Sequence, residues 1–392
     1  MSEVRCVTHN PAGRRRVVTT RLLPGDRWLG LLTGAGYRVD VCDSDLPLAT
    51  DDLLALVGGR CDAVIAQLTE HWDAALVEAL GRAGGGVLSL YSVGHDNVDV
   101  AAATRLGIAV GNTPGVLTET TAELAVALTF AAARRIVEAD GFLAAGRFTG
   151  WLPSLLLGKR LWGATLGVVG AGRIGRAYAR MMVQGHAMDL VYFDPRPDPE
   201  LETDVAAYGA FQAARGERPV TCRRAASLAD LLGVADIVSL HAALTVDTRH
   251  LIDRAALAAM KPDAVLVNTA RGPLIDEAAL VEHCRRHPSF TAALDVLEDE
   301  PRAAPGLLEL DNVIAVPHIG SATGWTRRGM AILAAANVVG VLSGLPAWRG
   351  DVAPFLGDDP PHAAPSIVNA DDLGLARAEV GGTAPGAVSA HG

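Results

Sequence analysis

The chain has 392 residues and a formal net charge of −10, and half of its residues are hydrophobic. This length predicts two domains with ample cores, and the acidic balance argues against nucleic acid and anionic membranes as partners. The five cysteines are scattered, which predicts reduced thiols and no metal site. We expect a cytoplasmic location, because no N-terminal stretch is typical of a signal peptide and no apolar stretch is long enough to cross a bilayer.

Alternating strand and helix signals predict parallel α/β sheets along most of the chain. In the first third, strands are expected at residues 37–42, 63–67, 87–91 and 108–111. Helical stretches between them make this part a small α/β domain of its own. A long alanine-rich helix then begins near Thr118 and is expected to lead into a second domain.

The most informative stretch opens that second domain and reads LGVVGAGRIGRAYAR. It combines an apolar strand, the pattern G-x-G-x-x-G at Gly170, Gly172 and Gly175, and a helix. The first glycine allows a sharp turn, the second allows close approach to a pyrophosphate, and the third allows tight packing of helix on strand. The helix N-terminus, with Arg173 and Ile174, presents unpaired N–H groups to the phosphates. The pattern predicts a dinucleotide-binding domain, and the competing interpretation is a glycine turn in an unrelated α/β domain.

An acidic residue follows the next strand, as the dinucleotide interpretation requires. Asp194 ends the strand of residues 190–193, about 20 residues beyond the glycines. A carboxylate there accepts hydrogen bonds from a ribose and repels a 2′-phosphate, which favours NAD over NADP. Arg196 could bind such a phosphate, but Pro195 and Pro197 are expected to hold it outward in an extended segment.

The rest of the chain continues the alternation. Strands are expected at residues 235–240, 264–268, 291–296 and 313–316, and helices at residues 253–260, 277–285 and from about 325 to 342. The connection of residues 195–224 is unusually long and contains a helical piece at residues 205–214. A tail rich in proline, alanine and glycine begins near Gly350, and we expect disorder after about Leu373.

Three polar residues follow predicted strands of the second domain: Arg271, Glu300 and His318. The carboxyl ends of strands in such a sheet face the ligand crevice, so these side chains can meet there. An arginine can bind a carboxylate through two hydrogen bonds. A histidine can protonate a carbonyl oxygen, and a neighbouring carboxylate favours its protonated form. Taken singly, each has an ordinary structural explanation, but together they predict the reduction of a 2-keto acid.

The chain resembles the D-2-hydroxyacid dehydrogenases, and the match runs nearly from end to end. The strings that carry it are YSVGHDNVD at 91–99, GNTPGVLTETTAE at 111–123, VGAGRIG at 169–175, NTARGPLIDEAAL at 268–280, LDVLEDEP at 294–301 and VPHIGSAT at 316–323. Within that family it is most similar to plant-type hydroxypyruvate reductases. The strings RRIVEADGFLAAGRFTGWLP, HIGSATGWTRRGMA and APSIVNADDLG, with the long insert after Asp194, carry this closer likeness.

The resemblance implies two doubly wound parallel-sheet domains. They would be a flavodoxin-like substrate domain of residues 1–120 completed by 319–350, a Rossmann NAD-binding domain of residues 121–318, and a partly disordered tail of residues 351–392. The implied activity is NADH-dependent reduction of hydroxypyruvate to D-glycerate, and of glyoxylate to glycolate. The implied partner is thus a small 2-keto acid.

The resemblance also implies roles for single residues. Arg271 would bind the substrate, and Glu300 and His318 would form the acid–base pair. Val93 and Gly94 would offer backbone N–H groups to the substrate carboxylate. The residues that would position the nicotinamide are Thr269, Ala270, Asp295, Gly320 and Ser321.

The segment GRFTGWLP, followed by a run of leucines, lies outside the strand–helix pattern. An apolar arm of this kind favours burial against a second subunit, although it could also fold back on its own domain. In related reductases the corresponding arm builds a dimer, and its tryptophan reaches the partner's substrate pocket. The resemblance therefore implies a homodimer in which Trp151 helps to bind substrate.

Two alternatives stay open at this point. One is another enzyme of the same family, above all a glyoxylate reductase, because glyoxylate differs from hydroxypyruvate only by the hydroxymethyl group. The other is a non-catalytic NADH-sensing scaffold like the corepressors built on this fold, which keep similar site residues. Measured turnover of NADH with hydroxypyruvate would separate an enzyme from a scaffold.

Overall fold

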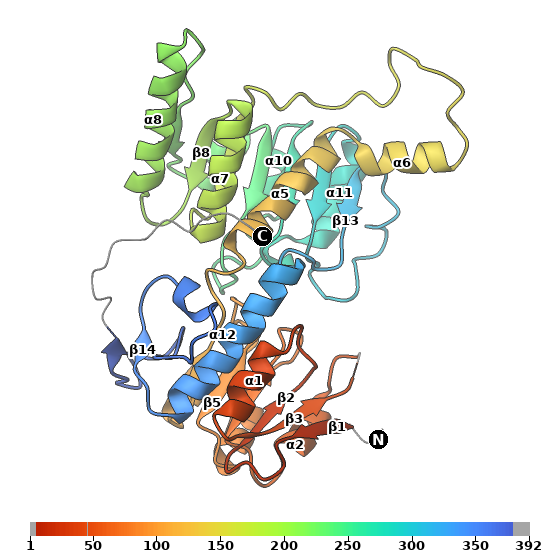
Figure 1. The fold of residues 1–392 in the computed structure, drawn as a ribbon. Helices are drawn as coiled ribbons and strands as arrows, with labels where there is room; N and C mark the ends of the chain where they lie inside the picture. Colours follow the sequence, from red (N-terminus) through yellow and green to blue (C-terminus); the bar gives the residue numbers. More distant parts are fainter. Residues whose placement is uncertain (1–4, 45, 379–392) are drawn as a thin grey trace. The chain divides into compact units, whose positions relative to one another are not determined.

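The computed structural model describes residues 5–44 and 46–378, and the chain divides into two compact units (Figure 1). Unit 2 is continuous and comprises Leu117–Ala322. Unit 1 combines the chain before it with the chain after it. The sequence had placed these boundaries at residues 120 and 318, a few residues away. Within the described ranges, no helix is long and apolar enough to cross a membrane.

Unit 1 contains a six-stranded sheet with the strand order β1-β3-β2-β4-β5-β6. The strands are β1 (Cys6–His9), β2 (Arg16–Thr19), β3 (Arg38–Cys42), β4 (Ala63–Ala66), β5 (Val87–Leu90) and β6 (Ala109–Gly111). All neighbours are parallel except β1, which pairs antiparallel with β3. The five parallel strands have the flavodoxin order 2-1-3-4-5.

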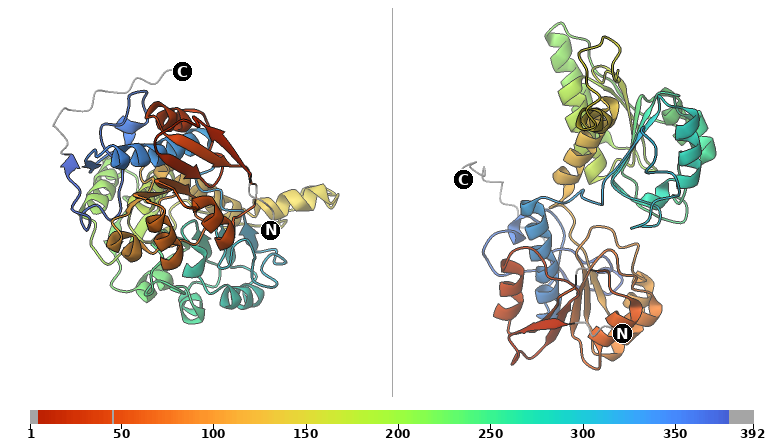
Figure 2. Two further views of the ribbon diagram at one scale, coloured as in Figure 1. Left: turned by 90° about the horizontal axis from the view of Figure 1, so that it is seen from below. Right: turned by 90° about the vertical axis from the view of Figure 1, so that its right-hand side faces the viewer.

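Helices cover both faces of this sheet (Figure 2). They are α1 (Arg27–Gly34), α2 (Thr50–Val57), α3 (Ala74–Arg82), α4 (Val100–Arg105) and α12 (Gly324–Leu342). Helices α2, α3 and α4 share one hydrophobic core with the strands, while α1 and α12 pack together on the other face. Strands such as AVIA and VLSL are buried along their whole length, as expected for a parallel sheet covered on both sides.

The tail differs from the expected disorder. It forms the short helix η2 (Ala353–Phe355) and the strand β15 (Arg377–Ala378), which pairs with β14 (Ala347–Trp348). Asp371 forms ion pairs with Arg349 and Arg377. Ala364, Ile367 and Ala370 are buried in a small apolar cluster, and Leu373 and Leu375 pack against it. The expectation of disorder after about Leu373 is therefore wrong for residues 374–378, because these contacts and the pairing of β15 hold them. Residues 379–392, on which the rest of that expectation falls, lie outside the described residues.

Unit 2 contains a parallel seven-stranded sheet with the order β13-β12-β11-β10-β7-β8-β9. The strands are β7 (Thr165–Val169), β8 (Asp189–Phe193), β9 (Cys222–Arg224), β10 (Ile237–Leu240), β11 (Val265–Asn268), β12 (Thr291–Leu294) and β13 (Val313–Ala315). This is the Rossmann order 3-2-1-4-5-6 with one strand added beyond the sixth. The predicted α/β class of two parallel-sheet domains is confirmed.

The helices of unit 2 are α5 (Thr118–Ala133), α6 (Ile136–Ala144), α7 (Arg173–His186), α8 (Pro199–Ala214), α9 (Leu228–Val234), α10 (Arg254–Ala259) and α11 (Glu277–Arg286). One hydrophobic core joins α5, α7 and α8 to the sheet, and another joins α9, α10 and α11 to it (Figure 2). Helix α6 has no buried residue, and it extends with the following loop away from the sheet (Figure 1).

Candidate active site

The glycine turn after β7 forms an open cradle at the start of α7. Gly170 has φ +92°, and a Cβ on it would lie 2.7 Å from the backbone of His241. A Cβ on Gly175 would lie 2.1 Å from the carbonyl oxygen of Gly170, so only glycine allows this packing of helix on strand. A Cβ on Gly172, in contrast, would meet nothing within 4 Å. The turn is therefore closed toward the protein and open toward a ligand.

The N-terminus of α7 lacks the side-chain cap that the four following helices have. Helices α8 to α11 each begin after an Asp or Ser whose side chain accepts a hydrogen bond from a first-turn N–H: Asp198, Ser227, Asp253 and Asp276. Helix α7 begins after Gly172, which has no side chain for this purpose. Its first-turn N–H groups, including those of Arg173 and Ile174, thus remain available for an anion.

Asp194 lies directly after β8 and is held beside the glycine turn. Its Oδ2 accepts the N–H of Ala171 at 3.0 Å, and its Oδ1 accepts the N–H of Arg196 at 2.9 Å. The Arg196 residue is exposed, as its flanking prolines predict. Arg224, which sequence reasoning missed, donates to the carbonyl oxygens of Asp194 and Pro195 at 2.7 to 3.0 Å. A carboxylate in this fixed place can accept hydrogen bonds from a ribose.

The structure brings together the three residues predicted to act on substrate. Arg271 follows β11, Glu300 lies in the loop after β12, and His318 follows β13. These strands are adjacent and parallel, so their carboxyl ends share one edge of the sheet. The Nδ1 atom of His318 lies 3.0 Å from Oε2 of Glu300. Since Glu300 binds Nδ1, Nε2 is the ring nitrogen that can act on a substrate.

The Glu300 carboxyl is held in its charged form. Burial by itself would raise its pKa, but the hydrogen bond with His318 opposes this effect. The N–H of Leu297, which donates to Oε1 at 3.1 Å, and the charge of Arg271 also favour the carboxylate. The pKa of Glu300 is therefore below its ordinary value. An ionised Glu300 can stabilise a protonated His318.

Asp295 fixes the loop that carries His318. This carboxylate is 1% exposed and accepts the N–H groups of Ile319 at 2.6 Å and Gly320 at 2.8 Å. Its own carbonyl oxygen accepts the N–H of His318 at 2.9 Å, and His318 has a φ of +54° in the left-handed region. Burial raises the pKa of Asp295 despite these partners. The backbone of His318 is thus imposed by Asp295 rather than by its own preference.

The turn that carries Arg271 packs directly on the loop that carries Glu300. The buried Asn268 shapes this turn, because its Oδ1 accepts the N–H of Ala270 at 3.0 Å and its Nδ2 donates to the carbonyl of Arg271 at 2.8 Å. A Cβ on Gly272 would lie 1.8 Å from the carbonyl oxygen of Leu297. Any larger residue at position 272 would push the two loops apart.

Sequence reasoning missed the two glutamates that brace the Glu300 loop. Glu277 is 3% exposed, and its carboxylate accepts the N–H groups of Glu298 at 2.7 Å and Ala304 at 2.9 Å. Glu298 in turn lies 2.5 Å from Nε2 of His250. In the sequence, Glu277 is indistinguishable from an exposed acid in the first turn of a helix. Only its burial identifies it as part of the site.

The remaining nicotinamide candidates line the same edge of unit 2. Thr269 is buried, and within the described ranges its hydroxyl oxygen has no hydrogen-bond partner. Gly320 is buried and Ser321 is half-buried. The open glycine turn, the uncapped α7 and the unsatisfied hydroxyl of Thr269 are groups that a bound dinucleotide would satisfy. The residues present therefore fit this cofactor.

The carboxylate-binding candidates Val93 and Gly94 belong to unit 1, in the loop after β5. The carbonyl oxygen of Val93 accepts Nδ2 of Asn112 at 2.8 Å, and that of Gly94 accepts Oγ of Ser92 at 2.7 Å. Both residues are half-buried, and the N–H groups of both have no acceptor in the described part of the chain. The loop thus presents two N–H groups that can bind an anion.

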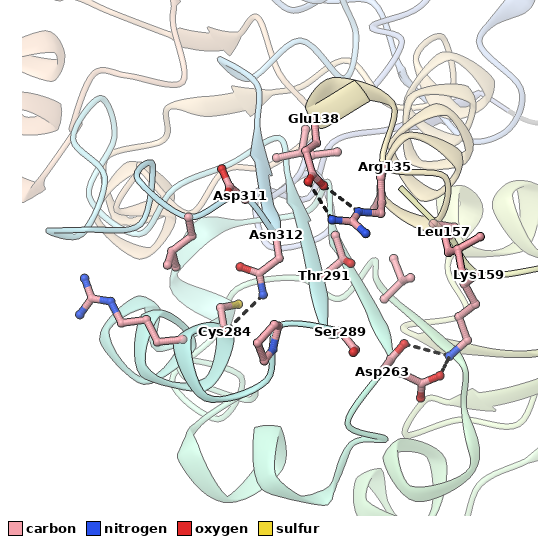
Figure 3. A pocket seen from close by; sticks show the side chains of 18 of the residues that line it. Arg135, Glu138, Leu157, Lys159, Asp263, Cys284, Ser289, Thr291, Asp311 and Asn312 are labelled. Carbon is pink, nitrogen blue, oxygen red and sulfur yellow. Dashed lines mark hydrogen bonds and ion pairs between the residues drawn. The ribbon is translucent and has the colours of Figure 1, made fainter. Parts of the chain in front are cut away.

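Trp151 lies in the arm after α6, and 81% of its surface is exposed. A hollow of about 690 Å³ borders the base of this arm, where Lys159 binds Asp263 (Figure 3). Its other walls include Thr291 and Asn312 at the amino-terminal ends of β12 and β13. The hollow therefore lies at the opposite edge of the sheet from Arg271, Glu300 and His318, and it is not the site of the predicted chemistry.

Comparisons with known proteins agree with this geometry. Residues 126–320 match the family model described as D-isomer specific 2-hydroxyacid dehydrogenase, NAD binding domain. The chain is 56% identical to a glycerate dehydrogenase of Cucumis sativus over 94% of this chain and 97% of that protein. It is 41% identical to a glyoxylate reductase of Thermococcus litoralis over 72% of this chain and 81% of that one. The solved structure of the Thermus thermophilus protein TT0316 has a TM-score of 0.74, with 40% identity, over 90% of this chain and 99% of that chain.

A Rossmann unit with an NAD-binding match and a carboxylate–imidazole pair at its strand ends defines an NAD-dependent oxidoreductase. The chain belongs to the D-isomer specific 2-hydroxyacid dehydrogenase family. The family predicted from the sequence motifs and the predicted NAD cofactor are thereby confirmed.

Proposed function

We propose that the protein reduces hydroxypyruvate to D-glycerate with NADH, and glyoxylate to glycolate as a second substrate. The observation that carries the chemistry is the contact of His318 Nδ1 with Glu300 Oε2 at 3.0 Å. These residues follow β13 and β12, and β12 is the neighbour of β11, which leads to Arg271. The choice of substrate is supported by the higher identity to a glycerate dehydrogenase than to a glyoxylate reductase.

In the proposed reaction, the guanidinium group of Arg271 pairs with the substrate carboxylate. The N–H groups of Val93 and Gly94 also bind this carboxylate. His318 donates a proton from Nε2 to the carbonyl oxygen of the substrate, and Glu300 stabilises the protonated ring beforehand. NADH supplies the hydride to the carbonyl carbon when it is bound. The products are the 2-hydroxy acid, NAD⁺ and neutral His318, which takes up a proton from water.

The cofactor would be held along the carboxyl edge of the unit 2 sheet. The N–H groups at the start of α7 would bind the pyrophosphate, and Asp194 would accept the hydroxyl groups of the adenosine ribose. The nicotinamide would be positioned by Thr269, Ala270, Asp295, Gly320 and Ser321. We propose NADH rather than NADPH because the charge of Asp194 repels a 2′-phosphate.

We further propose a cytoplasmic homodimer. Several apolar residues of α6 and the arm are each exposed over more than half of their surface. They are Ile136, Val137, Leu143, Phe148, Trp151, Leu152 and Leu157. Exposed apolar side chains concentrated on one segment favour a protein partner, and a second copy is the partner that the family resemblance supports. In the dimer, Trp151 of one chain would line the substrate site of the other.

The test is a substrate panel of hydroxypyruvate, glyoxylate and pyruvate with NADH and NADPH. We expect the highest kcat/KM with hydroxypyruvate and NADH. His318→Ala should lose about 10²- to 10⁴-fold in kcat, while NADH binding by fluorescence stays unchanged. Tight NADH binding without turnover of any substrate would contradict the proposal and support a scaffold. A higher kcat/KM with glyoxylate would identify a glyoxylate reductase instead.

A further inference from the structure

The tail segment, residues 363–370, runs along the free edge of β6 in unit 1. The N–H of Val368 donates to the carbonyl of Val110 at 2.7 Å, and the N–H of Val110 donates to Oδ1 of Asn369 at 2.9 Å. Ile367 pairs with Gly111 in an antiparallel bridge. The segment therefore continues the sheet beyond its last strand. This pairing places Ser366 next to the residue that follows β6.

That residue is Asn112, and it connects Ser366 with the loop of Val93 and Gly94. The hydroxyl group of Ser366 donates to Oδ1 of Asn112 at 2.6 Å. The Nδ2 of Asn112 then donates to the carbonyl oxygen of Val93 at 2.8 Å. An amide can rotate by half a turn and exchange its oxygen and nitrogen. The carbonyl of Val93 can only accept, so it selects the orientation in which the nitrogen faces it, and the Ser366 hydroxyl holds the amide in that place by donating to its oxygen.

A buried asparagine of α12 holds the same two residues from the other side. Oδ1 of Asn337 accepts the N–H of Ser366 at 2.8 Å, and its Nδ2 donates to the carbonyl of Asn112 at 2.9 Å. The N–H of Asn112 donates to the carbonyl of Ser366 at 3.2 Å. Asn337 is fully buried and Asn112 is 8% exposed. Ser366, Asn112 and Asn337 therefore form a closed ring of hydrogen bonds.

Planar peptide bonds couple this ring of hydrogen bonds to the N–H groups of Val93 and Gly94. The carbonyl of Val93 and the N–H of Gly94 belong to one trans peptide and point in opposite directions. When Asn112 fixes that carbonyl, it also fixes the direction of the Gly94 N–H. The N–H of Val93 is fixed in the same way, because the carbonyl of Ser92 accepts the N–H of Thr113 at 2.9 Å.

We propose that Ser366 is a positioning residue for the substrate carboxylate, acting through Asn112 on the N–H of Gly94. This inference rests on the proposed function, because the proposed function assigns binding of the substrate carboxylate to the loop of Val93 and Gly94. The near-terminal tail segment thereby becomes part of the substrate-binding apparatus of unit 1. No contact of Ser366 with substrate is required.

The test compares Ser366→Ala with Thr104→Val in the full-length enzyme. Ser366→Ala removes the hydroxyl that holds Asn112 in place through its Oδ1. Thr104→Val is the matched control, because it also removes one hydroxyl that bonds the tail segment, here the contact with Asn369 Nδ2 at 2.9 Å. This contact lies away from the Val93 loop. We measure KM and kcat for hydroxypyruvate and hydrogen–deuterium exchange of the peptide that spans residues 91–98.

For Ser366→Ala we expect KM to rise about 3- to 10-fold with little change in kcat, the loss expected for one hydrogen bond. Exchange in residues 91–98 should become faster. Thr104→Val should match the wild type in both measurements, and Ser366→Thr should restore them. The proposal is overturned if Ser366→Ala leaves exchange unchanged, or if both variants change alike. A wild type that does not reduce hydroxypyruvate refutes the proposed function, and the exchange measurement still decides the coupling of Ser366 to the loop.

Discussion

Replacing the Glu300 carboxylate by an amide tests the proposed acid–base pair. Glu300→Gln keeps the shape of the side chain and removes its charge, 3.0 Å from His318, with both side chains a little under one third exposed. At 3.0 Å two unit charges attract by about 1.4 kcal/mol at a dielectric constant of about 80, and by about 2.8 kcal/mol at about 40. Since ~1.36 kcal/mol corresponds to a factor of ten in rate, loss of this attraction should lower kcat/KM for reduction about 10- to 100-fold at a given pH.

The direction in which the pH profile moves depends on the form of His318 that is active. Reduction requires a proton on this ring, and the Glu300 carboxylate is the anion in contact with the ring. Without that anion the proton is held less tightly, so we expect the profile of kcat/KM for reduction to move to lower pH. The assay is NADH oxidation with hydroxypyruvate between about pH 5 and pH 9, a range that brackets the ordinary titration of histidine.

A control variant in the same loop separates charge from loop geometry. Glu298→Gln also removes a carboxylate, but one that lies 2.5 Å from His250 rather than near His318. We expect its half-activity pH to equal that of the wild type. An unmoved profile in Glu300→Gln would refute the pairing. Equal shifts in both variants would show that the loop, and not the charge of Glu300, sets the profile.

The same substitution has a consequence for stability. The pKa of Glu300 is lowered in the folded protein, so the ionised carboxylate stabilises the fold above the unfolded-state pKa. This contribution is lost as the pH falls through the folded-state pKa. The Tm of the wild type should therefore fall more steeply on acidification than that of Glu300→Gln. Parallel Tm curves would contradict the lowered pKa.

Two further substitutions test the cofactor and the arm. Asp194→Ala should lose about 10- to 100-fold in kcat/KM with NADH, the range for charge-assisted hydrogen bonds. Its NADH preference should narrow, because the charge that repels a 2′-phosphate is removed while the guanidinium group of Arg224 still binds the backbone of residue 194. A wild-type enzyme that works equally well with NADPH would contradict the role of Asp194. Trp151→Ala should raise KM for hydroxypyruvate by about tenfold and KM for glyoxylate less, since only the former carries the hydroxymethyl group. A fully active monomer in light scattering at micromolar concentration would exclude the proposed dimer.

The elements that could be predicted from the sequence are those whose characteristic residue pattern lies entirely within the element itself. Strands such as β10 and β11 are uninterrupted apolar runs between turns, and their expected bounds differ from the observed ones by at most two residues. Strands β1 and β2 were missed. They have four residues each, and β2 begins at Arg16, whose guanidinium binds Asp40 on β3 at 2.6 Å. A charge paired across neighbouring strands has no signature in a local window.

The residues of the site also fall into those that the local sequence identifies and those that only the folded structure identifies. Arg271, Glu300 and His318 were recognisable because each follows a clear strand. The side chains that hold their loops, such as Glu277, were not, because burial decides their role. The contact of Ser366 with Asn112 joins residues 254 positions apart. No spacing rule spans that distance.

The division of the chain has a consequence for its synthesis. Unit 2 is continuous, whereas unit 1 needs α12 and the tail segment, which emerge only after Ala322. At about 5 to 20 residues per second, a ribosome needs about 10 to 40 seconds for the intervening stretch. During that time the sheet of unit 1 lacks α12 on one face and the tail segment on the edge of β6. The part translated first must therefore complete its fold last, and its uncovered apolar surface is where nascent chains are most exposed to aggregation and to chaperones.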